Sequence, residues 1–366
     1  MARIDAFLKL GLTQNCSDIH LAVGVPPMLR MHGDLLPIKF RELGHQEMES
    51  YVDEIMTDAQ KKRFADGEDI DFSYVSEDDA RYRVNLFRKA TGVGATFRFI
   101  PTTVPTLESL NLPAAVRRVC DNHQGMVLVT GSTGTGKSTT LAAMIDYLNR
   151  NRNLNIISLE DPIEFVHQSQ KAQIIQRELG THLTSFADGI RSALREDPDV
   201  ILVGEMRDAE TISMAMTAAE TGHLVFGTLH TTGAVKTIDR IIDALPSDQR
   251  EQSKAFLAQS LKAVLTQNLI KTPDGKGRRA CLEIMIMTRA IANLIQSDQT
   301  HQVPSQLQTG ADIGMQLMDQ ALLQAVQAKE ADPDDAFRFA SDKSIFQKFV
   351  TDTTILQRVD LQQEPS

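Results

Sequence analysis

Residues 131–138 constrain this chain more than any other stretch, because they read GSTGTGKS. In this G-x-x-x-x-G-K-S pattern, glycines let successive backbone N–H groups turn toward an anion. The apolar residues 125–130 before it predict a buried strand, and residues 139–145 after it predict the start of a helix. Strand, glycine loop and helix form the context that a phosphate-binding loop requires. The predicted nucleotide-binding residues are Gly131, Ser132, Thr133, Gly134, Thr135, Gly136, Lys137, Ser138 and Thr139.

The two ends of this loop predict different contacts with a nucleotide. Lys137 is placed to reach the β- and γ-phosphates, and the hydroxyl of Ser138 to bind Mg²⁺. The helix that follows adds its positive amino-terminal end to the phosphates. The predicted ligands are therefore ATP and Mg²⁺.

Length and composition set wider bounds. A chain of 366 residues is expected to hold two domains. Its net charge of −10 argues against nucleic acid as a direct partner, because that affinity comes largely from neutralising phosphates. Cys16, Cys120 and Cys281 have neither metal-site nor disulfide spacing, and are expected to be buried apolar residues. There is no secretory pattern and no run of about 18 apolar residues, so we expect a cytoplasmic protein with at most peripheral membrane contact.

Residues 1–100 read as a small α+β domain. Strand 17–23 alternates polar and apolar residues, the period of a half-buried strand. The expected elements are a helix at 6–12, a strand at 17–23, a hairpin at 28–38, one or two helices at 45–66, and strands at 70–75, 81–88 and 94–100.

The last two of these strands carry four arginines, Arg81, Arg83, Arg88 and Arg98. Alternation along a strand puts Arg81, Arg83 and Asn85 on one face. One interpretation is a solvated sheet face. The other is that arginines are offered to a nucleotide phosphate across a domain or subunit boundary. The residues alone leave both open.

The prolines at 101 and 105 mark a stiff linker at 101–111. Residues 112–290 then alternate strands with helices, which predicts an α/β domain with a mostly parallel sheet and helices on both faces. Residues 291–366 look helical, with Met315, Met318, Leu322 and Val326 on one helical face that is expected to be core. The other expected elements are strands at 154–159, 200–203 and 223–229 and helices at 185–196 and 208–221.

Polar residues follow three of these strands, where ligands bind in such sheets. Hydrolysis needs groups that hold Mg²⁺, orient the attacking water and sense the γ-phosphate. Glu164 is assigned the role of orienting the attacking water, and Glu205 a place in the Mg²⁺ shell. The reverse assignment stays open. Gly204 stands where a P-loop ATPase usually has an aspartate. His230 is assigned as phosphate sensor, while His223 either assists it or is a satisfied histidine at a strand start.

At this point the chain resembles the type II/type IV secretion ATPases, and among them the pilus retraction ATPases. Residues 131–139 resemble the Walker A loop, 160–164 the Asp box, 194–208 the Walker B segment and 221–230 the His box; 17–21 and 81–87 resemble the N-terminal domain. The resemblance implies a RecA-like ATPase domain, a PAS-like N-terminal domain and a hexameric ring. It also implies that Arg83 and Arg98 reach a nucleotide. Further candidate site residues are Glu160, Asp161, His223 and Arg207.

Within this family, two features favour retraction over assembly. The chain lacks the four-cysteine zinc insertion of assembly and type II secretion members, and it begins close to the shared domain. Residues 290–297, AIANLIQS, resemble the retraction signature AIRNLIRE only in part, because Ala292, Gln296 and Ser297 replace its two arginines and its glutamate. The implied partners are an inner-membrane platform protein and a second retraction ATPase. The alternatives are an accessory PilU-like or assembly motor and, from another class, a nucleotide-regulated binding protein or nucleic-acid translocase.

Overall fold

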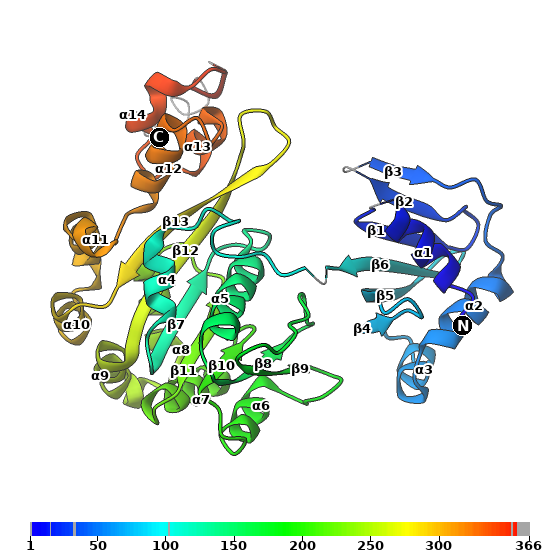
Figure 1. Cartoon of the computed structure of the whole chain (residues 1–366), viewed down its shortest axis with the longest axis horizontal. Helices are drawn as coiled ribbons and strands as arrows, with labels where there is room; N and C mark the ends of the chain where they lie inside the picture. Colours follow the sequence, from blue (N-terminus) through cyan, green and yellow to red (C-terminus); the bar gives the residue numbers. More distant parts are fainter. Residues whose placement is uncertain (1, 15, 32–33, 102, 353, 357–366) are drawn as a thin grey trace. The chain divides into compact units, whose positions relative to one another are not determined.

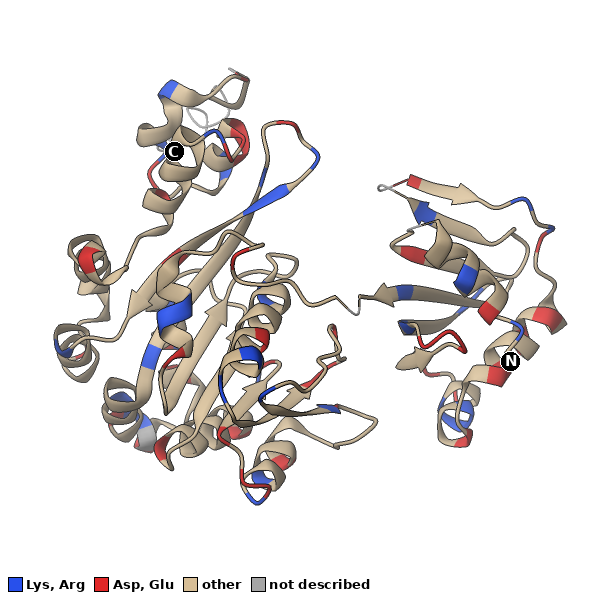
Figure 2. Ribbon diagram, viewed as in Figure 1, with Lys and Arg blue, Asp and Glu red and all other residues tan. Residues whose placement is uncertain are grey.

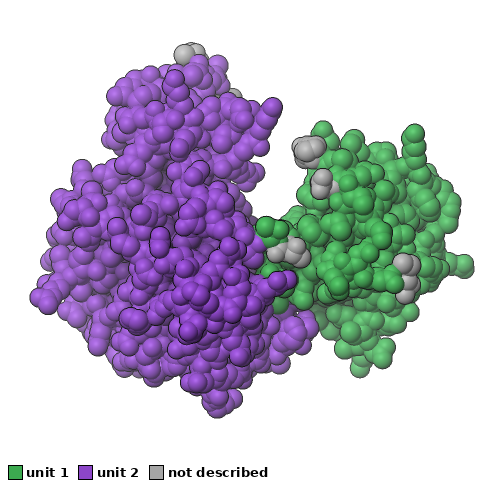
Figure 3. Space-filling model, in the orientation of Figure 1, with its two compact units in different colours: residues 1–103, 162–166 green, residues 104–161, 167–366 purple. Residues whose placement is uncertain are grey.

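The computed structural model describes residues 2–14, 16–31, 34–101, 103–352 and 354–356. The chain divides into two compact units (Figure 3). Unit 1 comprises residues 1–103 together with the short segment 162–166, and unit 2 comprises 104–161 and 167–366. The division at 103/104 falls inside the stretch predicted as a linker. Within the described residues, no helix is both long and apolar enough to span a membrane.

Unit 1 is a six-stranded antiparallel sheet with helices, in the strand order β3-β2-β1-β6-β5-β4 (Figure 1). All the elements predicted for residues 1–100 are present among the described residues; the turn of the predicted hairpin, at 32–33, lies outside them. Its strands are β1 Asp18–Ala22, β2 Met28–Met31, β3 Asp34–Pro37, β4 Ile70–Val75, β5 Arg81–Lys89 and β6 Gly92–Ile100, and its helices are α1 Asp5–Thr13, α2 His45–Ile55 and α3 Asp58–Ala65.

The two faces of this sheet differ in character. Ile19, Phe97 and Val84 lie opposite one another on β1, β6 and β5 and are fully buried in the core of unit 1. One residue further along each strand, the side chains change face. The adjoining row is therefore polar and runs through Asp18 of β1 and Arg98 of β6.

Unit 2 is built on a seven-stranded sheet in the order β13-β12-β7-β11-β10-β8-β9. Every neighbouring pair is parallel except β12 with β13, which confirms the mostly parallel α/β fold. The strands are β7 Gly125–Thr130, β8 Asn155–Glu160, β9 Gln173–Glu178, β10 Val200–Val203, β11 Leu224–Leu229, β12 Leu261–Lys271 and β13 Arg278–Ile286.

Helices cover both faces of this sheet, as the fully buried strand β7 requires. Its residues Met126 and Leu128 belong to one core cluster, and Val127 and Val129 belong to another. α4 Ala114–Cys120 and α5 Lys137–Asn151 contribute to the second cluster. The first cluster receives α6 Phe186–Ala193, α7 Ala209–Glu220, α8 Ala234–Ala244, α9 Arg250–Ser260, α10 Arg289–Gln296 and α11 Val303–Thr309.

The last helices form a smaller cluster beside β12 and β13. They are α12 Met318–Gln327, α13 Pro333–Phe339 and α14 Lys343–Phe346. Met318, Leu322 and Val326 are buried there against Ile270, while Met315 joins the main core, so the predicted apolar stripe is core. The three cysteines are free and buried, as expected.

Lys and Arg positions lie among Asp and Glu positions in both units (Figure 2).

Candidate functional site

One edge of the unit 2 sheet gathers most of the predicted site residues. Strands β7, β11, β10 and β8 are parallel neighbours, so their carboxyl ends emerge side by side. The glycine loop follows β7, and His230 follows β11. Glu205 follows β10 with Gly204 between them, and Asp161 follows β8. This edge is where open α/β sheets bind their ligands.

The loop itself has a conformation that depends on its glycines. Gly131, Gly134 and Gly136 have φ angles of 140°, 80° and 84°, in the region that L side chains rarely adopt. Space is also limited. A Cβ at Gly131 would lie 2.5 Å from the carbonyl oxygen of Gln267, and one at Gly136 would lie 2.8 Å from its Nε2 atom. The loop is therefore shaped by the neighbouring strand β12 as well as by its own sequence.

Lys137 is the first residue of α5 and its side chain is buried. Its Nζ atom donates hydrogen bonds to the carbonyl oxygens of Gly131 (2.9 Å) and Ser132 (3.0 Å). The ammonium group is thus held against the loop at the positive end of a 15-residue helix. Ser138 follows in the first turn and is half-buried. The loop has the geometry expected of a phosphate cradle.

Glu205 is the half-buried acid at this edge. Its Oε1 atom accepts a hydrogen bond from Nε of the exposed Arg207 and lies 3.0 Å from Nε2 of His230. Burial would raise the pKa of the Glu205 carboxyl, but the hydrogen bond from Arg207 and the charges of His230, Arg207 and Lys137 together lower it. Glu205 is therefore an ionised carboxylate within electrostatic range of Lys137.

Packing explains the glycine that precedes this acid. The backbone N–H of Gly204 donates to the carbonyl of Leu159 at the end of β8 (2.7 Å). A Cβ at position 204 would lie 3.0 Å from that carbonyl oxygen and 3.2 Å from the Cα of Glu160. A side chain at position 204, such as the aspartate usual in P-loop ATPases, would therefore make a tight contact with the backbone of β8, which glycine avoids.

The structure brings His230, but not His223, to the site edge. His230 follows the carboxyl end of β11 and is exposed, whereas His223 precedes the amino end of the same strand. Six residues of strand separate them by about 20 Å. Nδ1 of His223 lies 2.9 Å from the carbonyl of Ala218. In this chain His223 therefore has a hydrogen-bonding partner at the start of its strand and lies far from His230.

The acids of the 160–164 segment have different surroundings. Oε1 of Glu160 accepts hydrogen bonds from Ser158 (2.6 Å) and Gln176 (3.0 Å), which ties it to β8 and β9. Asp161 is exposed; the pKa of Arg207 is raised chiefly by its hydrogen bond to Glu205, and the charge of Asp161 adds to this. Glu164 is exposed and belongs to the segment 162–166 of unit 1.

The two arginines assigned to the site lie opposite each other on β5 and β6 of unit 1. Nε of Arg98 donates to Oδ1 of Asp18 at 2.8 Å, and the side chain of Asp18 is 6% exposed while that of Arg98 is 66% exposed. Nε of Arg83 lies 3.6 Å from Oδ1 of Asp71. The buried carboxylate of Asp18 thus holds the Nε atom of the exposed Arg98 and leaves much of its guanidinium accessible.

Arg88 does not belong to this group. It lies on the opposite face of β5, where its guanidinium sits 4.4 Å from the ring centre of Phe64 and donates to the carbonyl of that residue (2.7 Å). The sequence grouping of four arginines therefore contained one whose contacts are structural.

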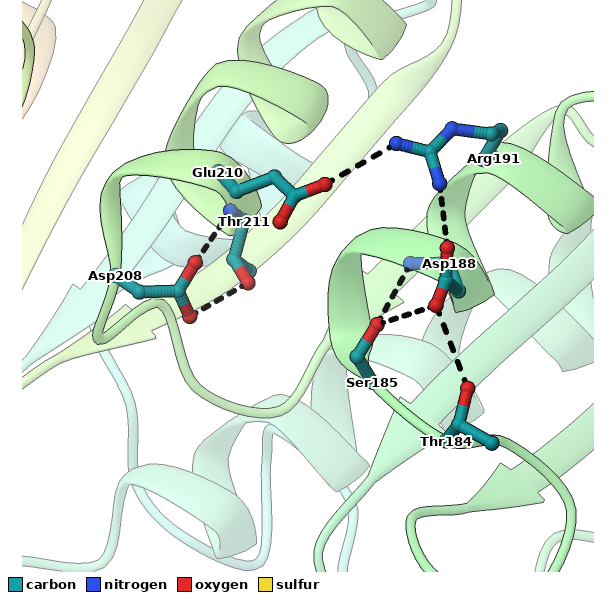
Figure 4. Close-up of polar contacts among 7 residues, drawn as sticks. All are labelled: Thr184, Ser185, Asp188, Arg191, Asp208, Glu210 and Thr211. Carbon is teal, nitrogen blue, oxygen red and sulfur yellow. Dashed lines mark hydrogen bonds and ion pairs between the residues drawn. The ribbon is translucent and has the colours of Figure 1, made fainter.

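Asp208, at the end of the predicted Walker B segment, is also structural (Figure 4). It caps α7 by accepting from both the backbone N–H and the hydroxyl of Thr211, each at 2.8 Å. The capping hydrogen bond lowers its pKa despite some opposing burial. Next to it, Arg191 of α6 pairs with Asp188 and with Glu210 of α7, linking the two helices.

Sequence reasoning missed Gln267 of β12, which touches the loop directly. Its Nε2 atom donates to the carbonyl of Thr135 (2.7 Å), and its Oε1 atom accepts from the hydroxyl of Thr140 in α5 (2.7 Å). Gln267 follows the loop by about 130 residues in a stretch with no motif, so no local signal could have identified it.

A parallel sheet with a glycine loop after one strand and an ionised acid after another is the arrangement found in P-loop ATPases. Comparison with known proteins agrees. Residues 3–332 match the family model described as type II/IV secretion system protein. The chain belongs to this family.

Individual relatives cover most of the chain. A twitching motility protein of Neisseria gonorrhoeae is 52% identical, over 86% of this chain and 84% of that protein. The type IV pilus retraction ATPase PilT of Pseudomonas aeruginosa is 50% identical, over 87% and 92%. The PilU ATPase of the same organism is 38% identical, over 92% and 88%. A crystal structure of the pilus retraction motor PilT with bound ADP matches with a TM-score of 0.88 and 39% identity, covering 95% of this chain and 99% of that one.

Proposed function

We propose that this ATPase is a motor that uses ATP hydrolysis to retract type IV pili, removing pilin subunits at the pilus base. The observation that carries the proposal is the 50% identity to a retraction ATPase across 87% of the chain, together with a phosphate loop of complete geometry. The retraction motor of known structure has bound ADP, which supports adenine nucleotide as the ligand here.

In the proposed mechanism, the loop at 131–139 holds the phosphates and Lys137 contacts their β- and γ-oxygens. To do so, the ammonium group exchanges its hydrogen bonds to the carbonyls of Gly131 and Ser132 for phosphate oxygens. Glu164 orients the attacking water, and His230 senses the γ-phosphate. The contact between His230 and Glu205 would let that sensor report to the acid beside it.

The donor set also fits a magnesium–nucleotide complex. Within the described chain, no group of three or more His, Cys, Asp and Glu side chains could hold a metal by itself. Ser138 offers a hydroxyl and Glu205 an ionised carboxylate, which are oxygen ligands that Mg²⁺ accepts beside nucleotide phosphates. When bound, Mg²⁺ would neutralise charge on the β- and γ-phosphates.

The working form in this proposal is a homohexameric ring. Arg83 and Arg98 point from an open sheet face, and an exposed guanidinium held by a buried acid suits contact with a phosphate from outside the unit. The ring would lie in the cytoplasm against the inner membrane and act on a platform protein there, beside a second retraction ATPase in some systems.

The second candidate function is an accessory motor, and α10 is the observation behind it. Ile291 and Ile295 of this helix are buried, while Gln296 and Ser297 face outward. The residues that depart from the retraction signature thus lie at or near the surface, where they alter a partner contact without disturbing the core. The higher identity to PilT than to PilU from one organism favours the retraction motor.

A deletion strain tests the proposal, complemented with the wild-type gene or with Lys137→Ala. A retraction motor predicts an excess of surface pili and loss of retraction, restored by the wild-type gene and not by Lys137→Ala. Bald cells would show an assembly motor. Normal pilus numbers with weakened retraction, in a strain that keeps its second ATPase, would show the accessory role.

A further inference from the structure

The side chain of Gln267 connects three elements of unit 2, namely β12, the phosphate loop and α5. It lies on β12, is 2% exposed, and bonds both to Thr135 in the loop and to Thr140 in the first turns of α5. The orientation of its amide is chemically determined. The carbonyl of Thr135 can only accept a hydrogen bond, so the nitrogen must face it and the oxygen is left for the hydroxyl of Thr140.

The contact with Thr135 fixes more than one atom. In a planar trans peptide the C=O and the following N–H point in opposite directions. Because Gln267 holds the carbonyl of Thr135 toward β12, the N–H of Gly136 is directed away from β12. Gly136 directly precedes Lys137, so its N–H is among the donors that a phosphate loop turns toward its anion.

The contact with Thr140 fixes the orientation of the side-chain amide of Gln267. Thr140 is buried, and its backbone N–H donates to the carbonyl of Gly136 at 3.0 Å. One buried side chain therefore ties the loop and the start of the helix to the same point of the sheet. Buried polar groups left without partners are costly, so this arrangement is specified rather than incidental.

We propose that Gln267 is a positioning residue for nucleotide binding, which holds the peptide between Thr135 and Gly136 so that the Gly136 N–H faces the phosphate. The inference rests on the proposed role of the loop at 131–139. Gln267 acts through the loop and does not touch the nucleotide, so its loss should weaken binding more than it slows the chemical step.

Three variants test this in the full-length ATPase. Gln267→Ala removes both contacts. Gln267→Glu keeps the acceptor for Thr140 but sets a carboxylate oxygen against the Thr135 carbonyl. Thr140→Val removes the hydroxyl that orients the amide. The control is Thr266→Val, which breaks the adjacent buried hydrogen bond between the hydroxyls of Thr266 and Thr130 (2.8 Å) and leaves both side-chain hydrogen bonds of Gln267 in place.

The readouts are the Kd of ADP, measured by titration calorimetry, the KM and kcat of ATP hydrolysis, and thermal unfolding without nucleotide. We expect Gln267→Ala and Gln267→Glu to raise Kd and KM at least tenfold, with a smaller change in kcat. Thr140→Val should raise Kd less, and combining it with Gln267→Ala should add little, because the two side chains act as one unit. Thr266→Val should lower the unfolding temperature but keep Kd within twofold.

The outcomes distinguish the role of Gln267 from the proposed role of the loop at 131–139. Wild-type Kd in a folded Gln267→Ala protein, with binding lost in Lys137→Ala, would overturn the role of Gln267 and leave the loop assignment standing. Equal loss of binding in Thr266→Val would also overturn it, because a general core defect would then suffice. Undiminished binding in Lys137→Ala would instead reject the loop assignment itself.

Discussion

Two regions of the molecule hold their polar groups in opposite ways. The phosphate edge is the carboxyl ends of β7, β8, β10 and β11 in unit 2, and the arginine face is the side of the unit 1 sheet that carries Arg83 and Arg98. At the phosphate edge, Lys137 and Gln267 are buried and bonded to the loop backbone, and Glu205 is half-buried and in contact with Arg207 and His230. On the arginine face, Arg83 and Arg98 project from the middle of open strands, each beside a carboxylate.

This difference indicates what each region needs in order to act. A cradle whose backbone is already fixed can bind an anion with little reorganisation. Exposed arginines lose rotamer freedom and solvation when they engage a phosphate, so they contribute only when something else holds the ligand. The phosphate edge should therefore bind nucleotide by itself, and the arginine face should matter for hydrolysis in the proposed ring.

The largest effect is expected at Lys137. Lys137→Ala removes the one lysine of the loop motif, so ATP hydrolysis should fall below detection. Lys171→Ala, at an exposed lysine of the same unit, is the matched control and should hydrolyse ATP normally. Steady-state phosphate release from purified protein measures both. Appreciable turnover in Lys137→Ala would break the assignment of the phosphate edge.

Changing Glu164 and Glu205 to glutamine, one at a time, should have two different effects on ATP hydrolysis. Glu164→Gln should bind ATP normally but hydrolyse it about 10²–10⁴-fold more slowly, the usual range for loss of a group that handles the water. Glu205→Gln should raise the Mg²⁺ concentration needed for half-maximal rate. Filter binding of ATP and a Mg²⁺ titration of turnover distinguish them. If the two phenotypes are exchanged, the two roles must be exchanged as well.

A smaller loss is expected on the arginine face. Arg98→Ala should lower kcat in assembled rings by about 10², as removal of one electrostatic donor does, and leave ADP affinity nearly unchanged. Arg41→Ala is the matched control, because Arg41 is an exposed arginine of unit 1 whose carboxylate partner, Glu47, lies outside this face. Turnover equal to wild type in intact rings would return Arg98 to a solvated sheet face.

The smallest effect concerns stability and pH. The pKa of Glu205 is lowered from 4.5 in the folded chain, so its ion pairs contribute stability that is complete above pH 4.5 and is lost as the pH falls through the folded pKa. Glu205→Gln lacks this titration. Its unfolding temperature should therefore fall less steeply than that of wild type below pH 4.5. Parallel curves from pH 6 to pH 3 would show that the ion pairs add nothing measurable.

The sequence predicted the elements and the loop well, because their signals are local. The glycine pattern at 131–138, the alternation in β5 and the apolar strand before Glu205 each depend on residues close in the chain. Contacts made by packing were not predictable in this way. Gln267 reaches the loop from a distant strand, and Gly204 lies close to the neighbouring backbone of β8. Arg88 is one of the four arginines that the sequence brings together, but alternation along β5 places it on the other face, against Phe64.

The most direct test of the central claim mixes two inactive variants. Lys137→Ala keeps the arginines but lacks a working loop, and Arg83→Ala/Arg98→Ala keeps the loop but lacks the arginines. If the arginines of one chain serve the nucleotide of another, rings formed from both variants should hydrolyse ATP well above the sum of the separate preparations. Mixed rings, verified by co-purification of two different tags, that show no gain would contradict the account.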